Sequence, residues 1–89
     1  MAAYQEDIRE WLNNAKEIDG ARYLLVACDT YDYEDYPIIF ENIEELKNRF
    51  QNPHSMEKFM ECYDLKLDLE SQLKDYRCWN PSQDELWSK

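Results

Sequence analysis

The chain has 89 residues, of which 44% are hydrophobic and 15% aromatic, and its 20 acidic and 10 basic residues give a formal net charge of −10. This length fits one domain, 1–89, and the aromatic content argues against an intrinsically disordered acidic chain. The negative charge disfavours direct binding to nucleic acids and anionic membranes, and it favours either simple solubility or a basic protein surface as partner.

The cysteines and the N-terminal residues indicate the cellular compartment. Cys28, Cys62 and Cys78 have no CxxC or paired spacing, so neither a zinc site nor a disulfide framework is expected. The N-terminus has no apolar segment typical of a signal peptide, and no apolar run approaches the roughly 20 residues of a membrane span. We therefore expect a cytoplasmic protein with reduced thiols.

The N-terminal segment has the pattern of an amphipathic helix. Apolar residues between Tyr4 and Ile18 recur at intervals of three and four. Gly20, the only glycine of the chain, follows and is expected to end the helix in a left-handed conformation. Trp11 lies on the apolar side, so this helix is expected to cover one face of a small sheet.

Two strand-like segments follow and predict a β-hairpin. Arg22–Cys28 is almost continuously apolar, which predicts a strand that is covered on both faces or central in a small sheet. Ile38–Phe40 is the second strand, and Pro37 is expected to start it or to lie on its edge side, because proline cannot donate to a ladder. A connection of about seven or eight residues joins the strands. The rest of the chain is expected to cover one side of this hairpin.

Helices are predicted after the hairpin. Asn42 and Glu45 have capping-box spacing at the start of a short helix that ends at Asn52-Pro53. Ser55 is the expected N-cap of the next helix. The buried stripe of that helix is expected to comprise Met56, Phe59, Met60 and Tyr63.

The segment after residue 64 has two interpretations. Leu65, Leu67 and Leu69 alternate with polar residues, which favours an extended link or a third strand around Leu65–Leu67. Alternatively, Asp68 caps a last helix. The apolar residues of that helix would be Leu69, Leu73 and Tyr76. An edge pairing with a second copy of the chain is the other way to complete so small a sheet.

The C-terminal residues 79–89 are expected to form a loosely docked tail or a hydrophobic anchor. Ser82 and Glu85 have capping-box spacing, which predicts a helical turn that carries Leu86 and Trp87. Trp79 and Trp87 would lie at the contact in a homodimer or an adaptor, since tryptophan is enriched in interfaces. The predicted fold class is α+β: an N-terminal helix, a two-stranded antiparallel hairpin, and two or three helices packed on it.

The sequence contains none of the common catalytic or cofactor motifs. His54, the only histidine, is distant in sequence from all three cysteines, so a Cys–His nucleophilic pair is not indicated. One glycine cannot build a phosphate-binding loop. The acids that follow Asp29 lack the central glycine and terminal glutamate of an EF-hand loop. We therefore expect no catalytic residues, no cofactor and no metal, with a small-ligand or divalent-metal module in the hairpin connection as the alternative.

Acidic residues and tyrosines concentrate in and after the hairpin connection. Between Tyr23 and Leu46 the chain has seven acidic residues and no lysine or arginine. Tyrosines among the acids provide rigid, amphipathic contact area, although Tyr36 is expected to pack inward. A surface of this kind favours a basic protein as partner. The predicted partner-binding residues are Asp29, Tyr31, Asp32, Tyr33, Glu34, Asp35, Glu41, Glu44 and Glu45.

The segment Val26–Thr30, followed by Asp32–Pro37, resembles a "V-x-C-D-T … D-Y-E-D-Y-P" segment of small uncharacterised proteins from bacteriophage and prophage genomes. These proteins carry the segment after an acidic N-terminal helix, and the resemblance extends to about residue 40. It implies a phage-encoded accessory protein in the host cytoplasm, of the kind that blocks a host defence such as CRISPR or restriction. We therefore expect an inhibitor of a basic nucleic-acid-handling protein such as a nuclease; the alternatives are the ligand or metal module and an oligomeric structural adaptor.

Overall fold

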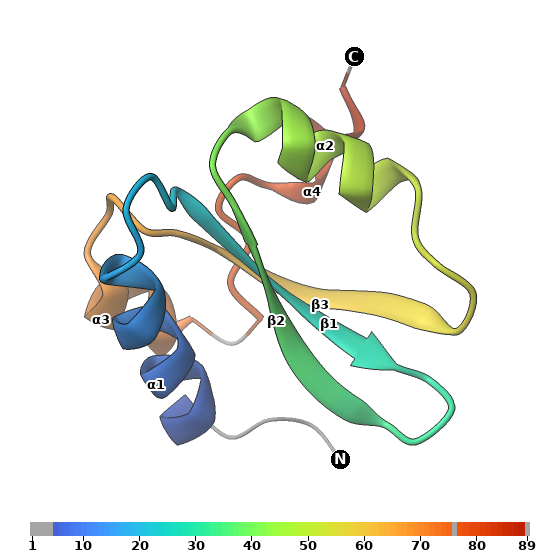
Figure 1. Cartoon of the computed structure of the whole chain (residues 1–89), viewed down its shortest axis with the longest axis horizontal. Helices are drawn as coiled ribbons and strands as arrows, with labels where there is room; N and C mark the ends of the chain where they lie inside the picture. Colours follow the sequence, from blue (N-terminus) through green and yellow to red (C-terminus); the bar gives the residue numbers. More distant parts are fainter. Residues whose placement is uncertain (1–4, 76, 89) are drawn as a thin grey trace.

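The structure is a computed structural model that describes residues 5–75 and 77–88 (Figure 1). These residues form a three-stranded sheet and four helices. The strands are β1 (Tyr23–Asp29), β2 (Glu34–Phe40) and β3 (Glu57–Asp64), in the order β2-β1-β3 with antiparallel pairing throughout. The helices are α1 (Gln5–Lys16), α2 (Ile43–Gln51), α3 (Leu69–Lys74) and α4 (Gln83–Trp87). The predicted α+β class is confirmed, with a third strand added to the hairpin.

The central strand β1 is buried from Tyr23 to Cys28, and its side chains alternate between two cores on opposite faces of the sheet. The first core comprises Ile8, Leu12, Ala15, Leu24, Val26, Tyr63, Leu65, Leu69, Leu73 and Cys78. The second core comprises Tyr23, Leu25, Phe40, Leu46, Phe50, Cys62 and Leu86. A strand that contributes to both cores must be apolar at every position, as its sequence indicated.

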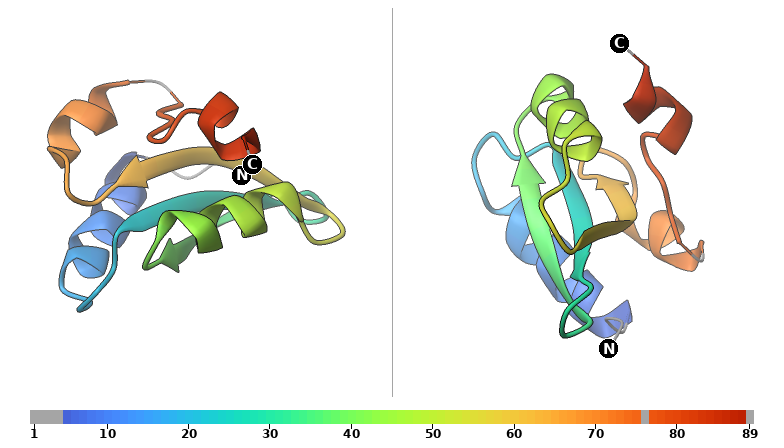
Figure 2. Two further views of the ribbon diagram at one scale, coloured as in Figure 1. Left: turned by 90° about the horizontal axis from the view of Figure 1, so that it is seen from above. Right: turned by 90° about the vertical axis from the view of Figure 1, so that its right-hand side faces the viewer.

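The helices form two pairs that cover different faces of the sheet. Figures 1 and 2 show α1 beside α3 at one side and α2 beside α4 at the other. The prediction that the rest of the chain covers one side of the hairpin is therefore wrong, because both faces of the sheet are apolar and each needs a cover. None of the helices in the described part of the chain is long and apolar enough to cross a membrane.

The predicted helix after Ser55 is also wrong, because Glu57–Asp64 forms the edge strand β3. A β-bulge explains the misleading spacing: Val26 pairs with Glu61 and Ala27 pairs with Phe59, so the residue between them on β3 has no partner. Apolar positions on the same face are consequently three residues apart at this point, as in a helix. Phe59 and Cys62 contact the second core, and Met60 and Tyr63 contact the first. The third strand also precedes Leu65–Leu67, where the sequence placed it as one alternative.

The hairpin is tighter than predicted. Asp29 pairs with Glu34, so the connection has four residues rather than seven or eight. Pro37 lies inside β2, opposite Val26, and does not start the strand. Because β2 is an edge strand of the sheet, a residue without an N–H group is tolerated there.

Most predicted helix boundaries are confirmed by their caps. Gly20 has the predicted left-handed conformation, with a φ of +87°, but α1 ends at Lys16, so Gly20 lies in the turn after the helix and does not end it. The Asn42, Asp68 and Ser82 side chains each accept a hydrogen bond from the backbone N–H three residues later. Ile18 lies beyond α1 and is 49% exposed, so it is not part of the buried stripe. Tyr4 and Tyr76, which were predicted on helical apolar faces, lie outside the described residues.

The C-terminal segment packs on β3 and α2. The N–H of Cys62 donates to the carbonyl of Cys78 at 2.9 Å, and the N–H of Asn80 donates to the carbonyl of Cys62 at 3.0 Å. These bonds cover part of the outer edge of β3. Leu86 is fully buried in the second core, which Trp79 also contacts, whereas Trp87 is 57% exposed.

Candidate binding surface at the hairpin end

The β1–β2 connection projects from one end of the sheet (Figure 1). Hydrogen bonds to its own carboxylates hold its shape. Asp29 Oδ1 accepts a hydrogen bond from the N–H of Tyr31 at 2.8 Å, and Asp32 Oδ1 accepts one from the N–H of Glu34 at 3.0 Å. Such turns let a short acidic side chain replace a backbone acceptor. Residues 29–34 are called the tip. Asp29 and Asp32 therefore fix the shape of the tip while they keep their negative charge.

Large apolar and aromatic side chains are exposed at the same end of the molecule. Tyr31 is 78% exposed, Tyr33 is 64% exposed, and Met56 in the α2–β3 connection is 59% exposed. The N–H of Thr30 donates to the carbonyl of Met56 at 2.8 Å, so the two connections are adjacent. Exposed side chains of this size beside solvated acids are typical of interaction surfaces.

Two of these three residues have strained backbones. Tyr33 has a φ of 60° and Met56 a φ of 61°, the left-handed region that glycine adopts most easily. A side chain in this region destabilises the residue by about 1–2 kcal/mol. Strain of this kind concentrates at functional sites, where the side chain is needed in that position.

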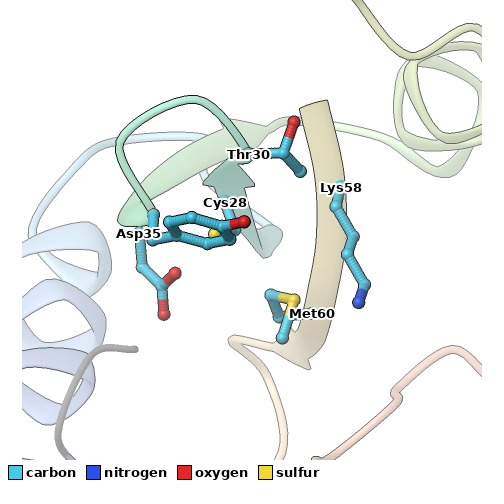
Figure 3. Close-up of a pocket in the computed structure, with 6 residues that line it drawn as sticks. Cys28, Thr30, Asp35, Lys58 and Met60 are labelled. Atoms are coloured by element: carbon cyan, nitrogen blue, oxygen red, sulfur yellow. The ribbon is translucent and has the colours of Figure 1, made fainter. Parts of the chain in front are cut away.

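A cleft of about 270 Å³ opens beside the tip (Figure 3). It is lined by Cys28, Thr30, Tyr33, Asp35, Lys58 and Met60. Cys28 pairs with Asp35 on β2 and with Lys58 on β3, so the three side chains form one row across the sheet. Figure 3 shows Asp35 and Lys58 on opposite sides of the cleft, with Cys28 between them.

The cysteine in the cleft is not activated as a nucleophile. Burial raises the pKa of the Cys28 thiol, and the neighbouring Asp35 carboxylate raises it further. A thiol with a raised pKa stays protonated at neutral pH, whereas catalytic cysteines need the thiolate. Cys28 therefore contributes an apolar wall to the cleft.

On the opposite face of the sheet, Glu57 is held by three neighbours. Arg49 donates two hydrogen bonds of 2.5 Å to its carboxylate, the Tyr36 hydroxyl donates one of 2.5 Å, and the N–H of His54 donates one of 3.0 Å. Burial raises the pKa of Glu57, but these hydrogen bonds and the Arg49 charge outweigh it and lower the pKa to about 2. Burial and the bond to Glu57 raise the pKa of Tyr36 to about 12. The hydrogen bonds among these four residues fix the conformation of the hairpin end.

The structure separates the nine predicted partner-binding residues into two groups. Those from Asp29 to Asp35 lie at the hairpin end, and the remaining three, Glu41, Glu44 and Glu45, follow the other end of β2. The length of β2 places the groups about 20 Å apart. Only the first group can share one small contact surface. Within it, Asp35 is half-buried and lines the cleft, while Asp32 and Glu34 are exposed.

Among the described residues, the tip acids Asp32 and Glu34 join no ion pair. The ion pairs found there connect Arg9 with Glu70, Arg22 with Asp64, Arg49 with Glu57, and Arg77 with Glu61. The negative charge of the tip is therefore available to a partner.

Three contributors to this end of the molecule were missed in the sequence. Met56, Lys58 and Met60 were assigned to a helix or ignored, because their place beside the hairpin depends on the pairing of β3 with β1. Lys58 also brings a positive charge next to a segment that contains none in sequence. No feature of the sequence indicated that Met56 would be exposed.

No group of three histidine, cysteine, aspartate or glutamate side chains in residues 5–75 and 77–88 is arranged to hold a metal ion. Comparisons with protein-family models, curated proteins and solved structures gave no match for this chain. Function is therefore inferred from the chemistry of the hairpin end.

Proposed function

We propose that this protein is a non-enzymatic inhibitor that docks its hairpin end on a basic, nucleic-acid-handling protein and blocks that protein's nucleic-acid site. The observation that carries the proposal is the combination of solvated carboxylates on Asp32 and Glu34 with the exposed side chains of Tyr31, Tyr33 and Met56. Acids attract a basic surface, and rigid aromatic side chains supply the buried anchors of an interface.

The overall charge supports a basic partner. At a net charge of −10, long-range attraction accelerates encounter with a positively charged surface and slows encounter with an acidic one. Protein surfaces that normally hold phosphates are the common basic surfaces of this kind. The tip carries few charges, so we attribute specificity to the tyrosines and Met56 and the encounter rate to the acids.

The resemblance to phage-encoded proteins gives the proposal its biological context. A phage accessory protein of this type would act on a host defence nuclease of a CRISPR or restriction system. The half-buried polar cluster at Glu57 supports the same role, because it holds the tip in one conformation before binding. A preformed tip loses less conformational entropy when the complex forms.

Site-directed photocrosslinking tests this proposal. A benzophenone amino acid replaces Tyr31 at the tip or, as a matched control, Leu67, which is 50% exposed and follows the opposite end of β3. In a bacterial lysate at low salt, the Tyr31 probe should crosslink a basic nucleic-acid-binding protein, and heparin or duplex DNA should compete. Equal crosslinking from both positions, or crosslinking that polyanions do not reduce, would contradict the proposal.

A further inference from the structure

We propose that the cleft at the hairpin end is a pocket for one arginine or lysine side chain of the protein partner. This inference rests on the proposed function and specifies what the partner inserts beside the tip. The cleft carries it because an apolar channel and a fixed carboxylate occur together at the edge of an acidic surface.

The lining suits the stem of a long cationic side chain. Cys28 and Met60 provide apolar walls, and the cleft has about 270 Å³ of space. Lysine and arginine bury their methylene stems along apolar surface and keep the charged group near water or a counter-ion. A short or branched side chain would leave part of this depth unfilled.

The charges around the cleft favour a cation over an anion. Asp35 is half-buried in the wall and lies directly opposite Cys28 in the pairing of β2 with β1, so the sheet fixes its place. Lys58 on the other side is exposed, and a solvated ammonium on a flexible stem is readily displaced. The exposed acids Asp32 and Glu34 near the cleft add to the negative potential.

Tyr33 adds an aromatic surface to the same pocket. It lines the cleft although its side chain is 64% exposed, so the ring stands at the rim. Guanidinium groups stack on tyrosine rings, and ammonium groups are attracted to their faces. A binding role for this ring would account for the positive φ of Tyr33, because strained backbones concentrate at functional sites.

The test uses the free protein and amino-acid amides, so it does not depend on knowing the partner. The backbone amide resonances of ¹⁵N-labelled protein are followed during titration with N-acetylarginine amide and, as the uncharged control, N-acetylnorleucine amide. Both have linear stems, and they differ in the cationic group. Resonances of Cys28, Thr30, Asp35 and Met60 should shift, with the arginine amide binding up to about five-fold more tightly, the upper end of the range for an exposed ion pair.

Two variants test whether the preference for the arginine amide is caused by charge. Asp35→Asn should remove the advantage of the arginine amide, and Lys58→Met, a change at an exposed residue, should increase it. Equal binding of both amides, shifts outside the cleft, or no shifts would overturn the pocket. Those results would leave the crosslinking from Tyr31 unaffected, so failure of the pocket is distinguishable from failure of the proposed function.

Discussion

Tyr36 and Glu57 lie on the two outer strands of the sheet, yet the Tyr36 hydroxyl donates a 2.5 Å hydrogen bond to the Glu57 carboxylate. The tyrosine must reach across β1 to make this bond. Its ladder partner on β1 is Ala27, whose small side chain leaves room for the crossing. Arg49 on α2 binds the same carboxylate, so the two outer strands and one helix are fixed together at the hairpin end.

Removing either side of this bond should destabilise the fold. We expect Tyr36→Phe to lower the free energy of unfolding by about 1 kcal/mol and Glu57→Gln by about 1–3 kcal/mol, because the second change leaves the Arg49 charge without its carboxylate. Urea unfolding measures both changes. Glu70→Gln is the matched control, since the exposed pair of Glu70 with Arg9 should contribute less than about 1 kcal/mol. A control variant as unstable as Glu57→Gln would contradict this account.

The same cluster predicts a pH dependence of stability. The folded-state pKa of Glu57, about 2, lies below the usual value of 4.5, so between these values the unfolded state binds more protons. The stabilisation from Glu57 is therefore complete above pH 4.5 and is lost as the pH falls toward 2. Urea midpoints of the wild type should fall more steeply over this range than those of Glu57→Gln. Parallel acid profiles would show that Glu57 is not the responsible group.

At alkaline pH, Tyr36 should make the protein less stable as the pH rises. Its folded-state pKa of about 12 lies above the usual 10, so the folded state retains the proton that the unfolded state loses. Its contribution is therefore complete below pH 10 and decreases as the pH rises toward 12. Tyr36→Phe should remove this part of the alkaline loss, which unfolding at pH 9 and pH 11 can measure.

Substitutions at Tyr33 and Met56, the two residues with left-handed backbones at the hairpin end, should change binding more than stability. In Tyr33→Gly and Met56→Gly, relief of the left-handed backbone offsets the extra freedom of the unfolded chain, so stability should change by less than about 1 kcal/mol. Tyr31→Gly lacks this compensation and should be the least stable of the three. All three should weaken binding to the crosslinked partner. If Tyr33→Gly lowers the free energy of unfolding by much more than about 1 kcal/mol, the Tyr33 ring has a structural role.

The thiols should react slowly in the folded protein. Burial raises the pKa of Cys62 and Cys78, the latter to about 11, and all three cysteines are buried. Reaction with a thiol-specific disulfide reagent at pH 8 should be slow without urea and fast in urea, with Cys28 in the cleft the first to react. Cys28→Ser should remove the fastest phase of this reaction. A first phase that survives this change would place the accessible thiol elsewhere.

Local signals in the sequence were sufficient for most of the helical boundaries and for the central strand. Asn42 and Ser82 each bond to a residue three positions later, so their capping roles could be predicted directly. β1 was recognised because a strand between two cores is apolar throughout. β3 was missed because the bulge opposite Val26 and Ala27 changes its period from two to three, and only pairing with β1 reveals the strand.

The candidate surface was predictable in its charge but not in its shape. The acids and tyrosines of the connection are contiguous in sequence, so their clustering was visible at once. The cleft depends on the alignment of Asp35, Cys28 and Lys58 across three strands, which local sequence does not encode. The separation of Glu41 from the tip likewise follows from the length of β2, since the sequence gives no measure of that distance without the strand boundaries.

The most direct test of the central claim compares the association rate constants of two variants with the crosslinked partner. Asp32→Asn with Glu34→Gln removes two acids at the tip, and Glu17→Gln with Asp19→Asn removes two exposed acids at the opposite end of β1, so both change the net charge from −10 to −8. At low salt the tip variant should associate about 10-fold more slowly than the control variant. The difference should vanish at about 1 M salt, where the screening length is about 3 Å. Equal rate constants for the two variants at low salt would contradict docking through the hairpin end.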